Sequence, residues 1–78
     1  MGHRAYILIE AEIGERHKVK DDLQKCEWVQ SVERLTGPYD MIAVANGGKS
    51  ELLDTVINES LKRISGIVRV IVCPIPAV

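Results

Sequence analysis

The chain has 78 residues, and ten basic side chains nearly balance eleven acidic ones, which leaves a net charge of −1. This length fits one domain, and so small a domain commonly gains stability from a disulfide framework, a metal or a partner subunit. The balanced charge provides no basic field for nucleic acid, and no apolar run approaches the roughly 20 residues of a membrane span. Two cysteines, Cys26 and Cys73, are too few for a disulfide framework and lie in no Cys/His cluster. We therefore expect a cytoplasmic protein with reduced cysteines, no metal or cofactor, and partner subunits.

The predicted elements follow one another in the order βαββαβ. Residues 4–13 alternate and predict a strand, with Ala5, Ile7, Ile9, Ala11 and Ile13 on one face and Tyr6, Leu8, Glu10 and Glu12 on the other. A helix is predicted at residues 15–26, strands at 31–36 and 39–46, a second helix at 51–64, and a β-branched strand at 67–75. In the second helix one broad face is apolar: Leu52, Leu53, Val56, Ile57, Leu61 and Ile64. The order predicts a single ferredoxin-like α+β domain over residues 1–78, with two helices on one face of a four-stranded antiparallel sheet.

Both faces of this predicted sheet carry apolar side chains, although two helices can cover only one of them. An antiparallel sheet with one solvated face should alternate apolar with polar residues, and a large exposed apolar patch usually marks an interface. We therefore predict a dimer that packs the two open sheet faces together. The face assigned to this interface consists of Leu8, Met41, Ala43, Val70 and Val72.

Little in the sequence favours catalysis. His3 lies at the N-terminus and His17 on the polar side of the first predicted helix, both without a Cys, His or Asp constellation nearby. Glu10 and Glu12 share a strand face, but solvation is the simpler interpretation of both. The basic stretch from Glu15 to Lys20 is interpreted in the same way, as a solvated helix face. We therefore expect no catalytic residues.

The turn Thr36-Gly37-Pro38-Tyr39-Asp40 combines a hydroxyl, a proline, an aromatic ring and a carboxylate, whereas a hairpin needs only a short turn such as Asn-Gly. One interpretation is structural, because Gly37 supplies backbone freedom, Pro38 rigidity and Asp40 a side chain that can bond turn amides. The other is a small-molecule site, because a carboxylate, a hydroxyl and open backbone amides can hold an ammonium and a carboxylate together. An α-amino acid presents that pair, and residue types alone do not decide between the two interpretations.

The stretches VERLTGPYDMIAVA and LLDTVINESLKRISGIVRVIVCPI resemble the effector-binding (RAM) domain of the Lrp/AsnC transcription regulators. The turn Thr36-Gly37-x-Tyr39-Asp40 and the junction Ile64-Ser65-Gly66-Ile67 are the most specific parts of this resemblance. It implies a ferredoxin-like fold, dimers through the sheet faces, assembly into octamers or similar rings, and amino-acid effectors between dimers. It also implies that Thr36, Gly37, Tyr39 and Asp40 frame the ligand, with contributions from Asn58 and Arg69.

Full-length members of that family carry an N-terminal helix-turn-helix, whereas here the first predicted strand begins at about residue 4. The chain thus resembles the stand-alone RAM proteins, or a domain excised from a longer regulator. We expect a non-enzymatic, amino-acid-sensing oligomer that binds no DNA directly and no membrane, and that assembles with full-length paralogues. The alternative is a small dimeric α+β-barrel enzyme of the monooxygenase or isomerase type, which would need polar or aromatic catalytic groups in an internal cavity.

Overall fold

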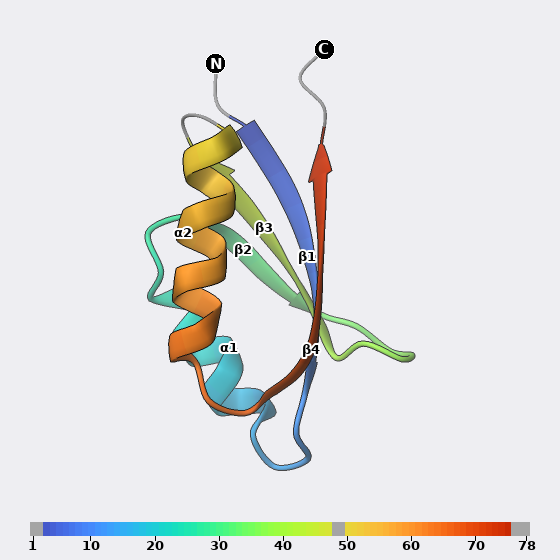
Figure 1. Ribbon diagram of the computed structural model, residues 1–78. Helices are drawn as coiled ribbons and strands as arrows, with labels where there is room; N and C mark the ends of the chain where they lie inside the picture. Colours follow the sequence, from blue (N-terminus) through green and yellow to red (C-terminus); the bar gives the residue numbers. More distant parts are fainter. Residues whose placement is uncertain (1–2, 48–49, 76–78) are drawn as a thin grey trace.

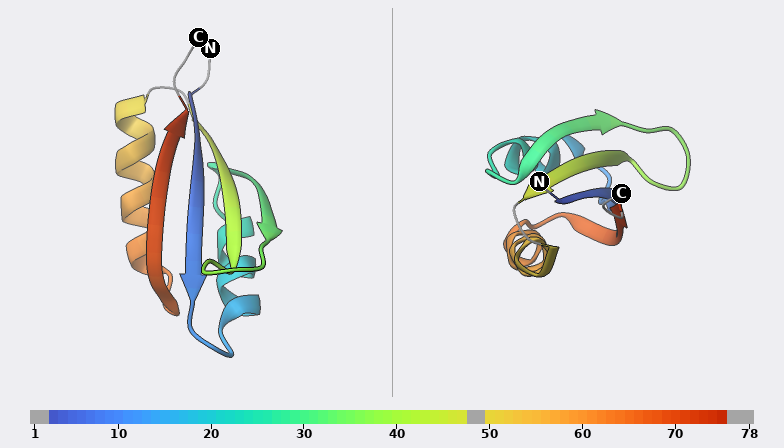
Figure 2. Two further views of the ribbon diagram at one scale, coloured as in Figure 1. Left: turned by 90° about the vertical axis from the view of Figure 1, so that its right-hand side faces the viewer. Right: turned by 90° about the horizontal axis from the view of Figure 1, so that it is seen from above.

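The computed structural model describes residues 3–47 and 50–75, which form one antiparallel sheet and two helices. The elements are β1 (His3–Ala11), α1 (Arg16–Gln24), β2 (Val29–Arg34), β3 (Met41–Gly47), α2 (Ser50–Arg63) and β4 (Ile67–Ile75). The strand order is β2-β3-β1-β4, so β1 and β3 are central. Both helices lie against the same face of the sheet (Figures 1 and 2). The predicted ferredoxin-like fold is confirmed.

The hydrophobic core lies between the two helices and the covered face of the sheet. On β1 the inward set Ala5, Ile7, Ile9 and Ala11 is buried, as the alternation predicted. Val19 and Leu23 of α1 and Ile57 of α2 close this layer and are fully buried. Each fully buried aliphatic side chain of this layer contributes about 1.5–3 kcal/mol to the stability of the domain.

The predicted end of the first strand was wrong by two residues. β1 stops at Ala11, and Ile13 lies in the following turn with 92% of its surface exposed. The chain turns away because the Glu12 amide donates to the Gly66 carbonyl at 2.8 Å and Gly14 adopts a φ of +89°. Glycine reaches that conformation at little cost. The alternation of apolar and polar residues therefore continues in the sequence beyond Ala11, where β1 ends.

The residues assigned to the open face of the sheet were mostly wrong. Met41 pairs with Ile9 and Ala43 with Ile7, and all four are buried beneath the helices. Val70 and Val72 also pack against this core, so only Leu8 of the assigned set lies on the open face. The open face instead carries Leu8, Ile42, Val44 and Ile71 on the three adjoining strands. The sheet is apolar on both faces, as predicted. On β3 and β4, however, the pairing register puts the residues assigned to the open face on the covered face.

The apolar face of α2 is narrower than predicted. Ile57 is fully buried and Leu61 and Ile64 pack against the core, at the spacing of one helical stripe. Val56 is 42% exposed, so its predicted place on that face was wrong. It follows from the geometry, because Val56 is turned by about 100° from Ile57 around the helix axis. The side chains of Leu52 and Leu53 lie outside the described part.

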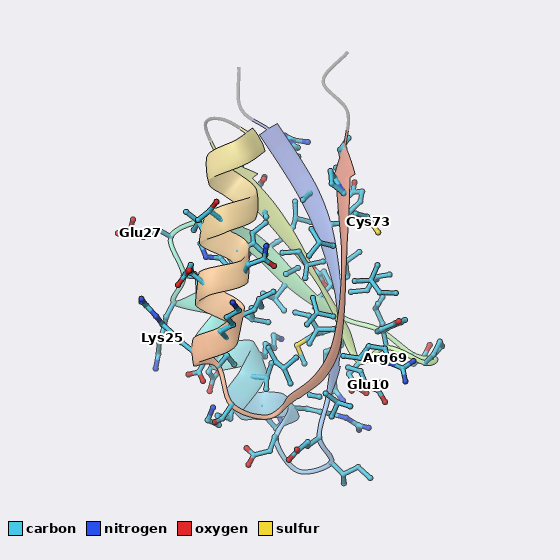
Figure 3. All side chains as sticks on the ribbon, in the orientation of Figure 1. Glu10, Lys25, Glu27, Arg69 and Cys73 are labelled. Carbon is cyan, nitrogen blue, oxygen red and sulfur yellow. The ribbon has the colours of Figure 1, made fainter. Side chains whose placement is uncertain are left out.

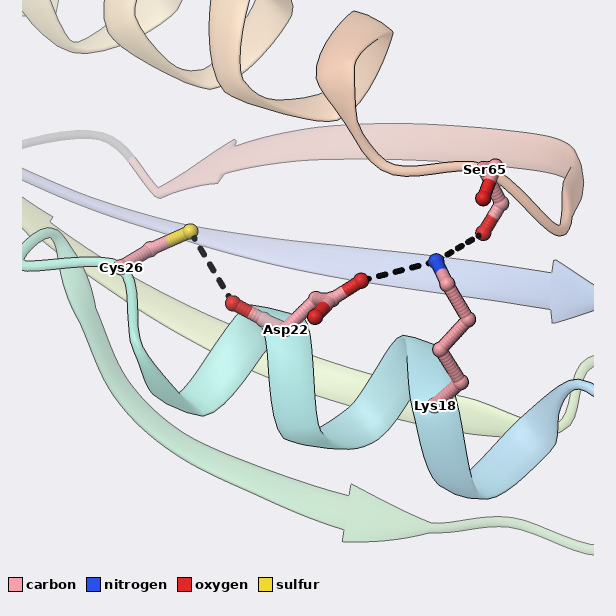
Figure 4. A network of polar contacts seen from close by, with 4 residues as sticks. All are labelled: Lys18, Asp22, Cys26 and Ser65. Carbon is pink, nitrogen blue, oxygen red and sulfur yellow. Dashed lines mark hydrogen bonds and ion pairs between the residues drawn. The ribbon is translucent and has the colours of Figure 1, made fainter.

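The junction between α2 and β4 is fastened to α1. Lys18 Nζ donates to the Ser65 carbonyl at 3.0 Å and pairs with Asp22 Oδ2 at 2.9 Å (Figure 4). Gly66 has a φ of +98°, and a Cβ there would lie 3.0 Å from Glu15 Cβ and 3.2 Å from Val19 Cγ2. The Ser65-Gly66 pair of the family resemblance therefore serves a close approach of the chain to the start of α1.

Candidate functional site

The loop between β2 and β3 is closed at its base and open at its tip. The Leu35 amide donates to the Asp40 carbonyl at 2.9 Å, which closes the loop over residues 36–39. Gly37 has a φ of +130°, a conformation that other residues rarely adopt. The loop extends beyond the sheet, away from the helices (Figure 1 and the right-hand view of Figure 2). It therefore stands on the side of the open sheet face.

Asp40 anchors this loop to β1 and α1. Its amide donates to the Ile9 carbonyl at 2.9 Å, and its Oδ2 accepts the Ala11 amide at 2.7 Å. Its Oδ1 lies 3.1 Å from Arg16 Nε, and its side chain is only 16% exposed. The carboxylate thus binds the Ala11 amide just beyond the last β1–β3 pair, Ile9–Met41. The register between β1 and β4 shifts at the same place, between Glu10 and Ala11. The bond to the Arg16 guanidinium is charge-assisted, which makes it stronger than a neutral hydrogen bond.

The tip of the loop leaves its polar groups unoccupied. Within residues 3–47 and 50–75, no hydrogen bond uses the amides of Thr36, Gly37 or Tyr39, and Pro38 has none. Thr36, Gly37 and Pro38 are exposed, and Tyr39 is partly buried. Three amides without a hydrogen-bond partner among the described residues and the exposed Thr36 therefore lie together on a loop whose base is fixed.

The structure brings Arg69 to the same end of the sheet as the loop, but not Asn58. Arg69 pairs with Glu10 on the open face, where its Nε lies 3.6 Å from Glu10 Oε1 (Figure 3). Glu10 follows Ile9, which binds the Asp40 amide. Asn58 instead lines a groove with Val72 and Pro74, which pair with Ile7 and Ala5 nearer the start of β1. Within one protomer, Asn58 therefore lies on the helix side of the sheet.

Sequence reasoning missed Arg16, which the structure places against Asp40. The two residues lie far apart in the chain, and no local spacing connects them. Arg16 belongs to the stretch that was interpreted as a solvated helix face. Only the pairing of β1 with β3, which brings Asp40 beside Ile9 and Ala11, reveals the contact.

Metal ligands, a reactive thiol or a membrane-spanning helix among the described residues would also bear on function. No group of three or more His, Cys, Asp or Glu side chains in this part of the chain could hold a metal ion. Burial, and to a lesser extent the nearby Asp22 carboxylate, raises the pKa of the Cys26 thiol, which makes it a poorer nucleophile at neutral pH. No helix in the described ranges has both the length and the apolar character that crossing a bilayer requires.

Comparison with known proteins identifies the family. The family model of the Lrp/AsnC ligand binding domain matches residues 4–74. The chain therefore belongs to the Lrp/AsnC ligand-binding domain family, a family of transcription regulators, as its residues suggested. A search of the curated proteins gave no significant match.

Solved structures agree with the fold. TTHA0845 of Thermus thermophilus has a TM-score of 0.89 at 22% identity, covering 97% of this chain and 95% of that one. E. coli AsnC gives 0.86 at 14% identity, with coverage of 96% and 51%. The transcriptional regulator NMB0573 of Neisseria meningitidis, solved as a complex with L-Met, gives 0.83 at 17%, with coverage of 96% and 50%. The chain thus spans almost all of the first protein and about half of the other two.

Proposed function

We propose that this domain is a non-catalytic sensor that binds an amino acid, or a closely related small molecule, at the loop of residues 36–40. The observation that carries the proposal is the set of three unoccupied amides at Thr36, Gly37 and Tyr39, above a base that Asp40 fixes. Backbone amides that point out of a rigid turn form a natural site for an anionic group such as an α-carboxylate. The meningococcal regulator of similar fold, solved with L-Met, supports the ligand class.

Asp40 has two parts in this proposal. It positions the loop, and its carboxylate keeps acceptor capacity for the ligand's ammonium, because two oxygens offer about four acceptor sites. The structure uses one site on each oxygen, for Ala11 and for Arg16. Thr36 contributes its hydroxyl, and Tyr39 packs its ring at the edge of the site.

Assembly completes the site in this proposal. The open face exposes Tyr6 by 45% and Ile71 by 40%, beside Leu8, Ile42 and Val44, and a second copy of the chain would cover this apolar patch. The loop stands on that same side, so a ligand there meets a neighbouring copy. Asn58 would contribute from a neighbouring copy, because it lies on the helix side of its own protomer. Arg69 would contribute from the open face, at the end of the sheet where the loop stands. Rings such as octamers follow if dimers meet at the loops.

Regulation would then follow from binding alone. A ligand that contacts two dimers binds the assembled state better than the separate dimers, and it shifts the population by that difference in affinity. The chain would transmit this shift through mixed assembly with full-length regulators of its family. No group in the site needs to form or break a bond.

A ligand screen tests the proposal. Thermal-shift assays against each standard amino acid should give a ligand that raises the melting temperature, and isothermal titration should then give its affinity. Gly37→Ala should weaken this binding, because it disturbs the amides at a φ of +130°. Gly14→Ala is the matched control, since Gly14 also has a positive φ and nothing within 4 Å of an added Cβ. A screen without any ligand, or equal affinities for the two variants, would overturn the proposed site.

Asp40→Asn tests the role of the carboxylate. Losing a charge-assisted hydrogen bond to the ammonium should weaken binding by about 1.5–3 kcal/mol, roughly ten- to a hundredfold. The asparagine can still accept the Ala11 amide through its carbonyl, so the loop should remain in place. An unchanged affinity would remove Asp40 from contact with the ligand. Loss of the fold, judged by circular dichroism, would show that Asp40 serves the loop alone.

A further inference from the structure

A second polar site lies on the helix side of Asp40, where α1 meets the ends of β2 and β3. Residues from all three elements line a cavity of about 130 Å³: Arg16, His17, Lys20, Arg34, Asp40 and Met41. The buried Met41 side chain is the apolar part of this lining. Arg34 of β2 thus joins the basic stretch of α1 in one lining.

The lining carries an uncompensated positive charge. Arg16, Lys20 and Arg34 are three cations against the one carboxylate of Asp40, which leaves a net charge of +2 with His17 neutral. Asp40 is already engaged by Arg16 and by the Ala11 amide. Elsewhere in the described ranges, no carboxylate lies within ion-pair distance of Lys20 or Arg34. This concentration of charge stands out in a chain whose overall charge is −1.

The position of these cations on α1 is unfavourable for the helix itself. The N-terminus of a helix carries a partial positive charge that favours acidic side chains. The N-cap Glu15 makes no side-chain capping bond, and the first turn of α1 contains no acidic residue but begins with Arg16, His17 and Lys18. Lys18 is compensated by Asp22, but Arg16 and Lys20 face the cavity. An anion between the helix start and Arg34 would relieve both the repulsion among the cations and the mismatch with the helix dipole.

We propose that this cavity binds a phosphate-type dianion, either free phosphate or the phosphate group of a small metabolite. A dianion matches the net charge of +2, whereas the carboxylate of an amino acid would leave one positive charge unbalanced. Asp40 is a positioning residue in this site. It holds Arg16 through Nε, so that the two terminal nitrogens of the guanidinium remain available for a bidentate contact with phosphate oxygens. A cavity of about 130 Å³ has room for a tetrahedral anion.

This site meets the proposed amino-acid site at Asp40, but the two differ in their other residues, so they can fail independently. The amino acid binds at the exposed tip of the loop, on the side of the open sheet face. The dianion binds behind the base of the loop, under α1. Lys20 and Arg34 belong only to the second site, so substitutions there leave the tip of the loop unchanged.

Isothermal titration of the full chain with inorganic phosphate at low ionic strength tests the proposal. We expect saturable binding of phosphate and sulfate, and much weaker binding of acetate. Lys20→Gln and Arg34→Gln should each weaken phosphate binding by about tenfold, because each removes one charge-assisted contact. Lys25→Gln is the matched control, since it removes the same charge from an exposed position beyond the other end of α1 (Figure 3). It should bind phosphate as the unchanged protein does.

Glycerol 3-phosphate distinguishes the two sources of the ligand. Equal affinities for it and for phosphate would show that the phosphate group alone is recognised, and tighter binding of the ester would indicate a metabolite. Failure of both to bind would overturn the proposal. Acetate that competes as well as phosphate, or a loss on Lys25→Gln equal to that on Lys20→Gln, would also overturn it.

Thermal stability in an anion-free buffer gives an independent readout. If the cations repel one another in the empty cavity, Lys20→Gln and Arg34→Gln should melt at a higher temperature than the unchanged protein. Adding phosphate should reverse this order, because only the unchanged protein gains stability from full binding. Lys25→Gln should gain no stability from the substitution. Variants at Lys20 and Arg34 that melt lower without anion, and respond to phosphate like the unchanged protein, would show that these side chains serve only the fold.

Discussion

The two faces of the sheet are built from alternate residues of the same strands, yet they differ in what covers them. On the helix side Ile7, Ile9 and Ala43 are fully buried, and two alanines on β3 leave room for the helices. On the open side Tyr6 and Ile71 remain 45% and 40% exposed. The open side nevertheless carries large apolar side chains, which a solvated sheet face does not need. The covered face forms the hydrophobic core of the domain. The open face has the composition of an interface, which is why we propose that a second copy covers it.

The largest effect is expected on the covered face, at Ala43. Ala43→Glu places a charge in a fully buried position opposite Ile7, with no partner and no room. The cost should exceed about 4 kcal/mol, the range of buried unpaired charges, and a domain this small should unfold. Circular dichroism of the purified variant checks this. A folded variant that had merely lost its dimer would return Ala43 to the open face and overturn the register.

Ile42→Glu is the matched change on the open face, one residue away. Ile42 pairs with Leu8 and is only partly buried, so the new carboxylate can reach water in the monomer. We expect a folded chain that sediments as a monomer, whereas the unchanged protein sediments as a dimer or a larger assembly. In the dimer the same carboxylate would be buried without a partner, which is strongly unfavourable. A variant of unchanged sedimentation would show that the open face is not the interface.

The sequence predicted the elements and their order, because the alternation of β1, the stripe on α1 and the β-branched run of β4 are local patterns. It could not assign the faces of β3, since Met41, Ala43 and Ala45 are as apolar as Ile42 and Val44. The register decides between them, because it pairs Met41 with Ile9 and Ala43 with Ile7 across the sheet. The turn itself was recognisable from residue types. Its partner Arg16 and the basic cavity were not, because they unite residues from separate elements.

A smaller effect is expected where the covered face is closed, at Gly66. In Gly66→Ala the new Cβ would press against Glu15 and Val19 of the α1 region, at a φ of +98°. Strain in the left-handed region alone costs about 1–3 kcal/mol, and the close contacts add to it. Urea denaturation should therefore show a lower midpoint. Gly14→Ala shares the positive φ but meets open space, so its smaller loss isolates the contribution of the contacts. Equal losses would mean that packing against α1 contributes nothing.

The smallest effect compares one cysteine on each side. Cys26 contacts the core and its Sγ lies 3.5 Å from the Asp22 carbonyl, whereas Cys73 pairs with Tyr6 and points away from the helices (Figure 3). Because the raised pKa of Cys26 lowers its thiolate fraction, iodoacetamide should modify Cys73 first at pH about 8. A raised folded-state pKa also means that the folded chain holds this proton more tightly than the unfolded chain. The resulting stabilisation is present below the unfolded pKa and is lost as the pH rises through the folded one, so stability should fall slightly in alkaline solution above pH about 8.5.

The same two thiols report on the open face without any substitution. If a second copy covers that face, the modification rate of Cys73 should fall several-fold as the protein concentration rises through the dissociation constant of the dimer. Cys26 lies on the helix side, so its rate should not depend on concentration. Mass spectrometry of each cysteine after a timed iodoacetamide pulse gives both rates from one sample, and Cys26 serves as the internal control. A Cys73 rate that stays constant while sedimentation shows a dimer would place the interface on another surface, and the open sheet face would then lose its proposed role.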